Sequence, residues 1–255
     1  MSLISRRAGQ VCIRVISSVL LISVQASAQS LLVRSEAPAW PGYGNSNFGL
    51  FASLLDTRFS GGVTVETNVS ALNHLLTFDA IMLNTGSSLS PTEISNLQQY
   101  AATGRRMVLF GESCCQPVGG NWNQDIASVV GGTYLGATPV GYANVVYQHA
   151  ITQGLSSIYH YYGGQMSGAA ASGGVDLTNL PGFLSLWGAN QNVLTFLDID
   201  APHDNNYYTE ATLLTNTADW LDESSAIAPE PSSIILLTTG LLAVFGVARR
   251  RRSQA

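Results

Sequence analysis

The sequence predicts an α/β domain with a doubly wound, mostly parallel sheet over residues 31–222. Short apolar runs alternate along the chain with segments of helical hydrophobic period, an order typical of parallel strands with helices on both faces. One helix has a clear capping signal at its start, and glycines follow the ends of several others. The intervening length of about 200 residues suits one domain with a sizeable core.

The first half of the domain is expected to hold four strands and two helices. The clearer helix begins at Ser90-Pro91-Thr92-Glu93, a capping box with proline at the first helical position, and Gly104 is its expected stop. The earlier helix, over residues 48–58, has leucine and phenylalanine at helical spacing and ends before Gly61-Gly62. The strands are expected at residues 31–34, 63–67, 78–84 and 106–111.

The second half has a weaker pattern. A helix over residues 121–130 should end at Gly131-Gly132, and a last helix is expected at 209–221. Residues 151–158 are interpreted as a turn or short helix, and the small residues of 163–174 as a flexible loop. Strands are expected at residues 183–187 and 192–199. No internal repeat is found.

The N-terminus has the three parts of a secretory signal peptide. Arginines precede an apolar stretch over residues 15–24, and Ala26-Ser27-Ala28 forms a small-residue cleavage site before Gln29. The apolar residues expected soon after a twin-arginine pair are absent, so the general secretory machinery is the expected route. Cys12 precedes the apolar stretch, so lipoprotein anchoring is not expected.

The C-terminus has a Pro-Glu-Pro turn, an apolar run over residues 234–248, and a block of arginines. A membrane-spanning helix needs roughly 20 apolar residues, so this run is short for a permanent anchor, although an ordinary single-span tail anchor is the alternative. Positive charge just beyond a span holds that end in the cytoplasm. The arrangement resembles the PEP-CTERM sorting signal of Gram-negative bacteria. The residues that carry it are Pro229, Glu230, Pro231, Arg249, Arg250, Arg251 and Arg252.

That resemblance implies export, transient anchoring in the inner membrane and recognition of the Pro-Glu-Pro region by an exosortase. Release or transfer to the cell surface or extracellular matrix would follow, often in bacteria that make exopolysaccharide, a candidate partner. The expected organisation is a signal peptide over 1–28, the α/β domain over 31–222, a linker over 223–228 and the sorting signal with its short transmembrane helix over 229–255.

Charge and cysteine content exclude several functional classes. Residues 29–228 contain four arginines and fifteen acidic residues, a formal balance of 4 − 15 = −11, and the chain has no lysine. Such an acidic surface is unsuited to phosphate backbones, so nucleic-acid binding is not expected. Beyond the signal peptide only Cys114-Cys115 remains, as two thiols or as a strained vicinal bridge. No zinc spacing occurs, and we expect no cofactor.

The middle of the chain resembles the class I glutamine amidotransferase-like, flavodoxin-like superfamily, including its ThuA-like members. The matching pieces are "FDAIMLNTGSSLSPTEISNLQQYAATGRRMVLFGE" and "VLTFLDIDAPHDNN", the latter followed by a helix that closes in "ADWL". The resemblance implies that residues 31–222 form one such domain.

Catalytic members of that superfamily carry a nucleophile elbow, G-x-C-x-G, after the strand equivalent to 107–111. Here Gly111-Glu112-Ser113-Cys114-Cys115 offers Ser113 or Cys114 as nucleophile, but the second glycine is missing. The family's His-Pro-Glu would correspond to Pro202-His203-Asp204, where the order differs. The resemblance therefore implies Ser113, Cys114, His203 and Glu112 as catalytic candidates, or as degenerate remnants of a catalytic site.

In an open α/β sheet, ligands bind at the carboxyl ends of the strands. There the sequence predicts a polar, net acidic edge with four candidate ligand-binding residues. Asp198 and Asp200 could offer oxygen ligands to Ca²⁺. Pro202 interrupts the spacing, so a solvated strand end without a metal is the favoured interpretation. The ligand-binding candidates are Glu36, Asn84, Asp198 and Asp200, and Ser35, Thr85, Glu112, Ser113 and His203 are expected at the same edge.

Isolated histidines and clustered aromatic residues have simpler interpretations. His74, His149 and His160 are expected at the surface or as hydrogen-bonded core residues. The tryptophans and the tyrosine cluster could stack on sugars, but plain packing is favoured. These aromatic residues are Trp40, Trp122, Trp187, Tyr159, Tyr161 and Tyr162.

Two functional classes remain open. The favoured one is a non-enzymatic exported protein whose domain binds a small molecule or polysaccharide at the acidic edge. The other is an extracellular hydrolase or amidase that uses Ser113 or Cys114 with His203 and one acid, which could be Glu36, Glu112 or Asp198.

Overall fold

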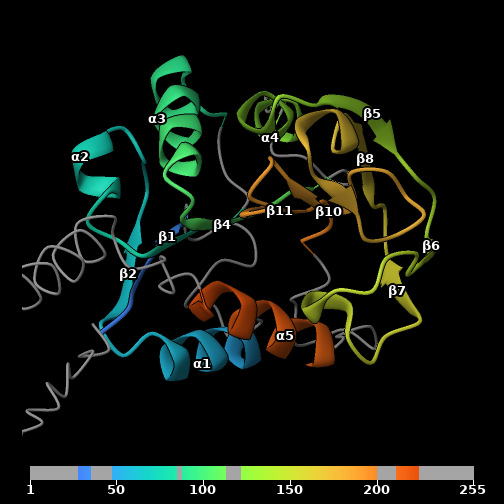
Figure 1. Ribbon diagram of the computed structural model, residues 1–255, viewed down its shortest axis with the longest axis horizontal. Coiled ribbons are helices and arrows are strands. Elements are labelled where there is room, and N and C mark those ends of the chain that lie inside the picture. The colour runs from blue at the N-terminus through green and yellow to red at the C-terminus, as the bar shows by residue number, and fades with distance from the viewer. Residues whose placement is uncertain (1–27, 36–47, 85–87, 113–121, 200–210, 224–255) are drawn as a thin grey trace, which may run out of the picture.

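A central sheet of seven strands organises the protein (Figure 1). The computed structural model describes residues 28–35, 48–84, 88–112, 122–199 and 211–223. The strand order is β2-β1-β3-β4-β11-β10-β9. The strands are β1 (Ser30–Arg34), β2 (Gly62–Glu66), β3 (Ala80–Leu83), β4 (Arg106–Phe110), β9 (Val175–Asp176), β10 (Leu184–Trp187) and β11 (Val193–Phe196).

Five neighbouring strands, from β2 to β11, run parallel. β10 is antiparallel to β11, and β9 is antiparallel to β10. The central strands are almost wholly apolar, as expected of strands covered on both faces. In β1, Leu31, Leu32 and Val33 are fully buried. The mostly parallel α/β sheet expected from the sequence is confirmed.

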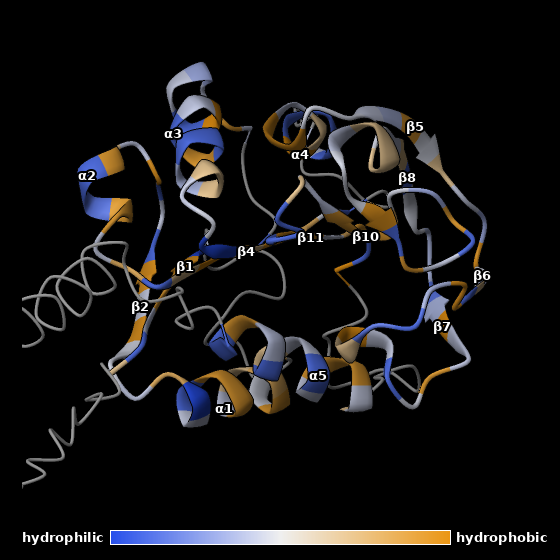
Figure 2. Ribbon diagram, in the orientation of Figure 1, coloured by the Kyte–Doolittle hydropathy of each residue, from blue (hydrophilic) through white to orange (hydrophobic). Residues whose placement is uncertain are grey.

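Helices cover both faces of this sheet (Figure 1). On one face, α1 (Gly49–Arg58) packs against α5 (Ala211–Asp222). On the other face, α3 (Pro91–Ala102) lies between α2 (Leu72–Leu75) and α4 (Trp122–Val130). Figure 2 shows that α1, α4 and α5 each carry both hydrophobic and hydrophilic stretches, as helices with one face on a core do.

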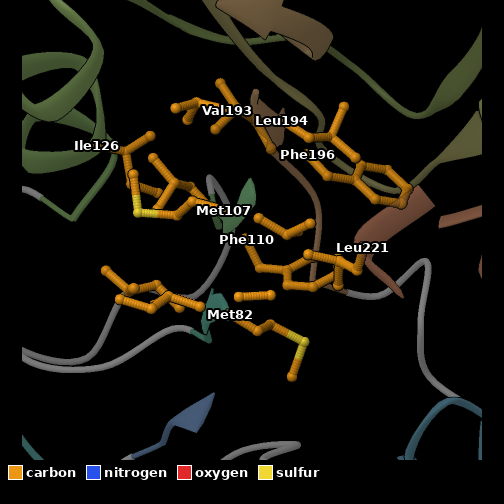
Figure 3. Packing of buried hydrophobic residues seen from close by; sticks show 14 of the residues in the cluster. Met82, Met107, Phe110, Ile126, Val193, Leu194, Phe196 and Leu221 are labelled. Carbon is orange, nitrogen blue, oxygen red and sulfur yellow. The ribbon is translucent and has the colours of Figure 1, made fainter. Parts of the chain in front are cut away.

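The core lies between the two helix layers and the central strands. Figure 3 shows Ile126 of α4 beside Met107 of β4, and Leu221 of α5 beside Phe110 of the same strand. Phe110 also contacts Phe196 of β11, with ring centroids 5.7 Å apart. Burial of each such side chain contributes about 1.5–3 kcal/mol, so this contact network between strands and helices is the main source of stability.

The helix signals of the sequence are confirmed at α3. Ser90 Oγ accepts a hydrogen bond from Glu93 N–H, and the Glu93 carboxylate accepts one from Ser90 N–H at 2.9 Å. Pro91 is the first helical residue, and Gly104 has a φ of +83° just after the helix. This capping box begins the helix where the sequence predicts it.

The segment between α4 and β9 differs from the prediction. Two small antiparallel sheets occur there, one of β5 (Thr133–Ala137) with β8 (Gly164–Ser167) and one of β6 (Gly141–Asn144) with β7 (Ser157–His160). The prediction of a loop at 163–174 is therefore wrong at its start, where β8 pairs with β5. The residues of β8 have little strand propensity of their own, so the sequence did not indicate this pairing. The turn or short helix expected at 151–158 contains the η2 turn (Ala150–Thr152) and then the start of β7; a second such turn, η3 (Ala170–Ser172), follows β8. The short helix α2 was also missed.

Several predictions lie outside the described residues: the signal peptide up to Ser27, the linker beyond Glu223, and the sorting signal with its apolar helix. None of the helices within the described ranges has the length and apolar character needed to cross a bilayer.

Candidate functional site

The carboxyl ends of β1, β3, β4 and β11 meet at one edge of the sheet because these strands are parallel neighbours. This arrangement places Ser35, Asn84, Glu112 and Asp198 at that edge, as the sequence predicts. The other candidates expected there lie outside the described residues. They are Glu36, Thr85, Ser113, Cys114, Asp200 and His203.

Asn84 follows β3 and is buried, with 1% of its surface exposed. Its N–H donates a hydrogen bond to the carbonyl of Arg34, at 3.0 Å, across the parallel pair of β1 and β3. Asn84 therefore extends the sheet by one residue beyond β3, and its side chain starts from a closely packed part of the edge.

A buried arginine at this edge was missed by the sequence analysis. Arg34 ends β1 with only 2% of its surface exposed, and its guanidinium lies over the Trp122 ring, 5.1 Å from the ring centroid. Such a cation–π contact stabilises a guanidinium that has lost much of its water. The available signal was a charged residue at the end of an otherwise apolar strand, 31–34, in a chain with few basic residues.

Glu93 supplies negative charge on the same side of the sheet. Its carboxylate accepts hydrogen bonds from Ser90 N–H, Ser90 Oγ and Val69 N–H, at 2.9, 2.9 and 3.2 Å. Burial opposes ionisation of Glu93, but these hydrogen bonds and the nearby Arg34 charge outweigh it and lower the pKa of Glu93. Glu93 is therefore an ionised structural residue that partly balances Arg34.

The first two residues of α4 hold the end of β4. Trp122 Nε1 donates to the carbonyl of Phe110 at 2.7 Å. Asn123 binds the main chain of Glu112 twice: its Oδ1 accepts from Glu112 N–H at 3.0 Å, and its Nδ2 donates to the Glu112 carbonyl at 2.8 Å. The last described residue before Ser113 and Cys114 therefore has a fixed backbone.

Asp198 joins the end of β11 to the chain that follows β7. It is buried, with 2% of its surface exposed, and its Oδ2 accepts from Tyr161 N–H at 2.7 Å. The neighbouring Leu197 carbonyl accepts from Gly164 N–H at 2.8 Å. The edge of the sheet is therefore connected to both small sheets, through Tyr161 just after β7 and through Gly164 at the start of β8.

The part of the chain that the structure describes has no cluster of three His, Cys, Asp or Glu side chains that could bind a metal ion. Asp200, the second carboxylate of the calcium alternative, lies outside that part. At the described edge, polar side chains form hydrogen bonds to the backbone. The charged residues there are one buried cation, Arg34, and three acidic residues, Glu93, Glu112 and Asp198.

The three histidines have structural contacts. Nδ1 of His149 accepts from Ile151 N–H at 3.2 Å, and Nδ1 of His160 accepts from Gly163 N–H at 3.3 Å. Burial lowers the pKa of both, with the Arg106 charge adding to the effect at His149. His74 lies 2.7 Å from Glu66 at the surface.

The aromatic residues divide into two groups. Trp122 and Trp187 are 1% exposed and pack in the core, which fits the packing interpretation. By contrast, Tyr161 and Tyr162 are 43% and 39% exposed, although the sequence favoured packing for them too. Trp40 lies outside the described residues.

The C-terminal residues 228–252 match the family described as the PEP-CTERM protein-sorting motif. The sorting signal predicted from the sequence is confirmed, and it implies export to the cell surface and recognition by an exosortase. No curated protein matches the chain significantly.

Solved structures show where the fold recurs. The chain is similar to the mmIFT52 N-terminal domain, with 11% identity, a TM-score of 0.58 and coverage of 76% of this chain and 97% of that one. It is also similar to part of an α-L-fucosidase isoenzyme 2 from Paenibacillus thiaminolyticus, with 8% identity, a TM-score of 0.50 and coverage of 78% and 33%. A putative ThuA-like protein from Bacteroides uniformis matches with 16% identity, a TM-score of 0.46 and coverage of 76% and 90%. This chain therefore combines a PEP-CTERM sorting motif with an α/β fold that is also found in the mmIFT52 N-terminal domain.

Proposed function

We propose that this protein is exported, processed at its sorting signal, and retained at the cell surface or in the extracellular matrix as a binding protein. Its α/β domain would bind a small molecule or a polysaccharide and would not catalyse a reaction. In this proposal the general secretory machinery exports the chain, and the apolar run 234–248 holds it briefly in the inner membrane until an exosortase acts near Pro229-Glu230-Pro231.

The binding proposal depends on one observation: polar side chains at the described edge are buried and form hydrogen bonds to the protein's own backbone. Asn123 is occupied by the Glu112 backbone, and Asp198 by the backbone of Tyr161. Both side chains are 2% exposed. A general acid or base must reach the substrate proton directly or through one water, which a buried side chain with a structural partner does poorly.

The ligand-binding residues proposed at this edge remain Glu36, Asn84, Asp198 and Asp200, with Asp198 also organising the backbone near the ligand. A carbohydrate is the ligand class to test first, since the fold also occurs within a protein named as an α-L-fucosidase. The likeness extends to the fold alone.

A second candidate, a hydrolase or amidase, is favoured by one feature. Gly111 has no room for a Cβ, which would collide with Asn123 Oδ1 and Leu197 Cδ2, so the chain is closely packed directly before the position where the superfamily places its elbow. In this alternative Ser113 or Cys114 is the nucleophile and His203 the base.

The test uses the full chain, produced in an exosortase-containing bacterium and recovered from its surface fraction. Serine- and thiol-directed probes should label wild type and the His203→Ala variant alike. Selective labelling of Ser113 or Cys114 that disappears in His203→Ala would replace the binding proposal with the hydrolase.

Processing is tested on the same material. Mass spectrometry should find a mature C-terminus near the Pro-Glu-Pro turn and an N-terminus at Gln29. A mature chain that still ends at Ala255 would contradict the processing part of the proposal and leave the binding part to be judged by the probes.

A further inference from the structure

A long uncharged segment interrupts this acidic domain. Between Asp125 and Asp176, residues 126–175 contain no Asp, Glu, Lys or Arg. Six of the chain's ten tyrosines fall within these residues. The segment includes most of α4 and the two small antiparallel sheets. In Figure 1, β5, β6, β7 and β8 lie at the right-hand end of the molecule, beyond β10.

Exposed apolar side chains concentrate in this segment. Among the described residues nine large hydrophobic side chains are exposed, and seven of them belong to residues 126–175. Clustered exposure of this kind marks an interaction site, whereas single exposed apolar residues are ordinary. The seven are Leu135, Val140, Tyr142, Val146, Tyr147, Tyr161 and Tyr162.

The β6–β7 sheet presents its tyrosines on one face. Tyr142 and Tyr159 are directly opposite in the antiparallel register, and their ring centroids lie 5.3 Å apart with the planes at 75°. Ala143 and Ile158, opposite each other at the next position, point inward and are fully buried. Because side chains alternate along a strand, the tyrosines point outward, and Tyr142 is 64% exposed.

A second pair of exposed tyrosines follows directly after β7 in the chain. Tyr161 and Tyr162 have ring centroids 5.0 Å apart, with planes at 85°. We call Tyr142, Tyr159, Tyr161 and Tyr162 the tyrosine surface. In each pair the edge of one ring meets the face of the other, so the two pairs present phenol rings in several orientations, with hydroxyl groups attached.

The backbone beneath the tyrosine surface is held by the main domain. Tyr161 N–H donates to Asp198, and Asn144 N–H donates to Asn179 Oδ1 at 2.7 Å. Asn179 N–H in turn donates to the Asn144 carbonyl at 2.9 Å. A surface fixed in this way loses little conformational entropy when a ligand binds, which favours affinity.

The absence of charge decides which partner this surface suits. Nucleic acids, anionic membranes and charged peptides are recognised through ion pairs, and residues 126–175 offer none. A pyranose ring has an apolar C–H face and a rim of hydroxyls, which complement the faces of phenol rings and their hydroxyls. We infer that the tyrosine surface binds a neutral polysaccharide by stacking on its sugar rings.

This inference rests on the proposed binding function and names both the ligand class and the surface. It also assigns Asp198 a supporting role, since its hydrogen bond to Tyr161 positions the second pair. The exposed tyrosine faces, and not the buried polar edge, would then provide most of the contact area with the polysaccharide.

The experiment measures binding of the full chain to soluble dextran, laminarin and mannan by affinity electrophoresis and calorimetry. Wild type should bind at least one of them, with affinity that changes less than about twofold between about 0.05 and 0.5 M salt, because screening affects only charged contacts. Combined Tyr142→Ala and Tyr162→Ala substitutions should weaken binding at least about tenfold, while Tyr142→Phe, which keeps the ring, should retain most of it. Val65→Ala, which shortens an exposed side chain on β2 outside the segment, is the matched control.

Other outcomes would overturn the inference. One is that wild type binds none of the three polysaccharides. Another is that the Tyr→Ala variants have the wild-type circular dichroism spectrum and bind as tightly as wild type. A dimer that dissociates in the Tyr142→Ala variant would identify the surface as a contact between copies of the chain. Loss of the polysaccharide interaction leaves the probe-labelling result unchanged, so this failure can be told apart from failure of the proposed function.

Discussion

Asn123 holds the main chain of Glu112 from both sides, with Oδ1 accepting its N–H at 3.0 Å and Nδ2 donating to its carbonyl at 2.8 Å. The two residues are 11 positions apart, one just after β4 and the other in the first turn of α4. Trp122 also donates a hydrogen bond to the Phe110 carbonyl. Together these contacts from α4 fix the backbone at the β4 end of the candidate site.

Replacing Asn123 by alanine should destabilise the domain by about 2–3 kcal/mol, because two hydrogen bonds are lost and the Glu112 backbone loses its partners. Chemical denaturation monitored by tryptophan fluorescence measures this. Gln124→Ala, at an exposed position in the same helix turn, should change the free energy of unfolding by no more than about 0.5 kcal/mol. Equal effects of the two substitutions would mean that the double contact contributes nothing.

Gly111→Ala should also destabilise the domain, by about 2–4 kcal/mol, because the added methyl group collides with Asn123 Oδ1 and Leu197 Cδ2. Thermal unfolding checks this against Gly141→Ala in β6. There the nearest atom to the new methyl group is His160 Nε2 at 3.6 Å, an ordinary contact, so little change is expected. A Gly111→Ala protein as stable as wild type would show that the chain around Gly111 relaxes freely.

Arg106, the first residue of β4, connects this strand to α5 through side-chain contacts. Its guanidinium donates to the Trp220 carbonyl, lies over the Trp220 ring 4.8 Å from the centroid, and contacts Glu223 at 3.3 Å. Arg106→Lys should cost about 1–3 kcal/mol and speed proteolytic release of a fragment that contains α5, because lysine cannot keep these three contacts together. Glu223 is 62% exposed at its side chain, so Glu223→Gln should cost about 0–1 kcal/mol. Comparable losses in the two variants would assign the stabilisation to the ion pair alone.

His160 should make stability depend on pH. Burial lowers the pKa of His160 below its ordinary value of 6.5 in the folded protein, so the unfolded chain takes up a proton first as the pH falls. The contribution of neutral His160 to the free energy of unfolding is fully present above about pH 6.5, and it is lost as the pH falls through the pKa of His160 in the folded protein. His160→Asn keeps an acceptor for Gly163 N–H but does not titrate, so it should lose less stability than wild type between pH 7.5 and about pH 5.

Denaturant titrations of both proteins across this range measure the difference. Subtraction cancels the groups that both share, including Asp222, whose pKa burial raises. Parallel stability curves for wild type and His160→Asn would contradict the prediction.

The first half of the domain was predictable because its signals are local. The capping box at Ser90–Glu93 and the apolar run of 31–34 define α3 and β1 without help from the rest of the chain. Parallel order then places Asn84, Glu112 and Asp198 at one edge, as expected. The small strands β5 and β8 carry no such signal, since each is defined mainly by its pairing with the other, and Tyr134 opposite Met166 is the one pair in their register without a small residue.

By itself the sequence determined the sorting signal, the alternation of strands and helices, and the edge where polar residues gather. These depend on residue type and spacing along the chain. The tertiary structure alone decided that Arg34 is buried against Trp122, that Asn123 is occupied by Glu112, and that Tyr142, Tyr161 and Tyr162 face outward. Each of these features depends on how separate elements pack together. Whether these side chains are buried or exposed therefore cannot be derived from a local sequence pattern.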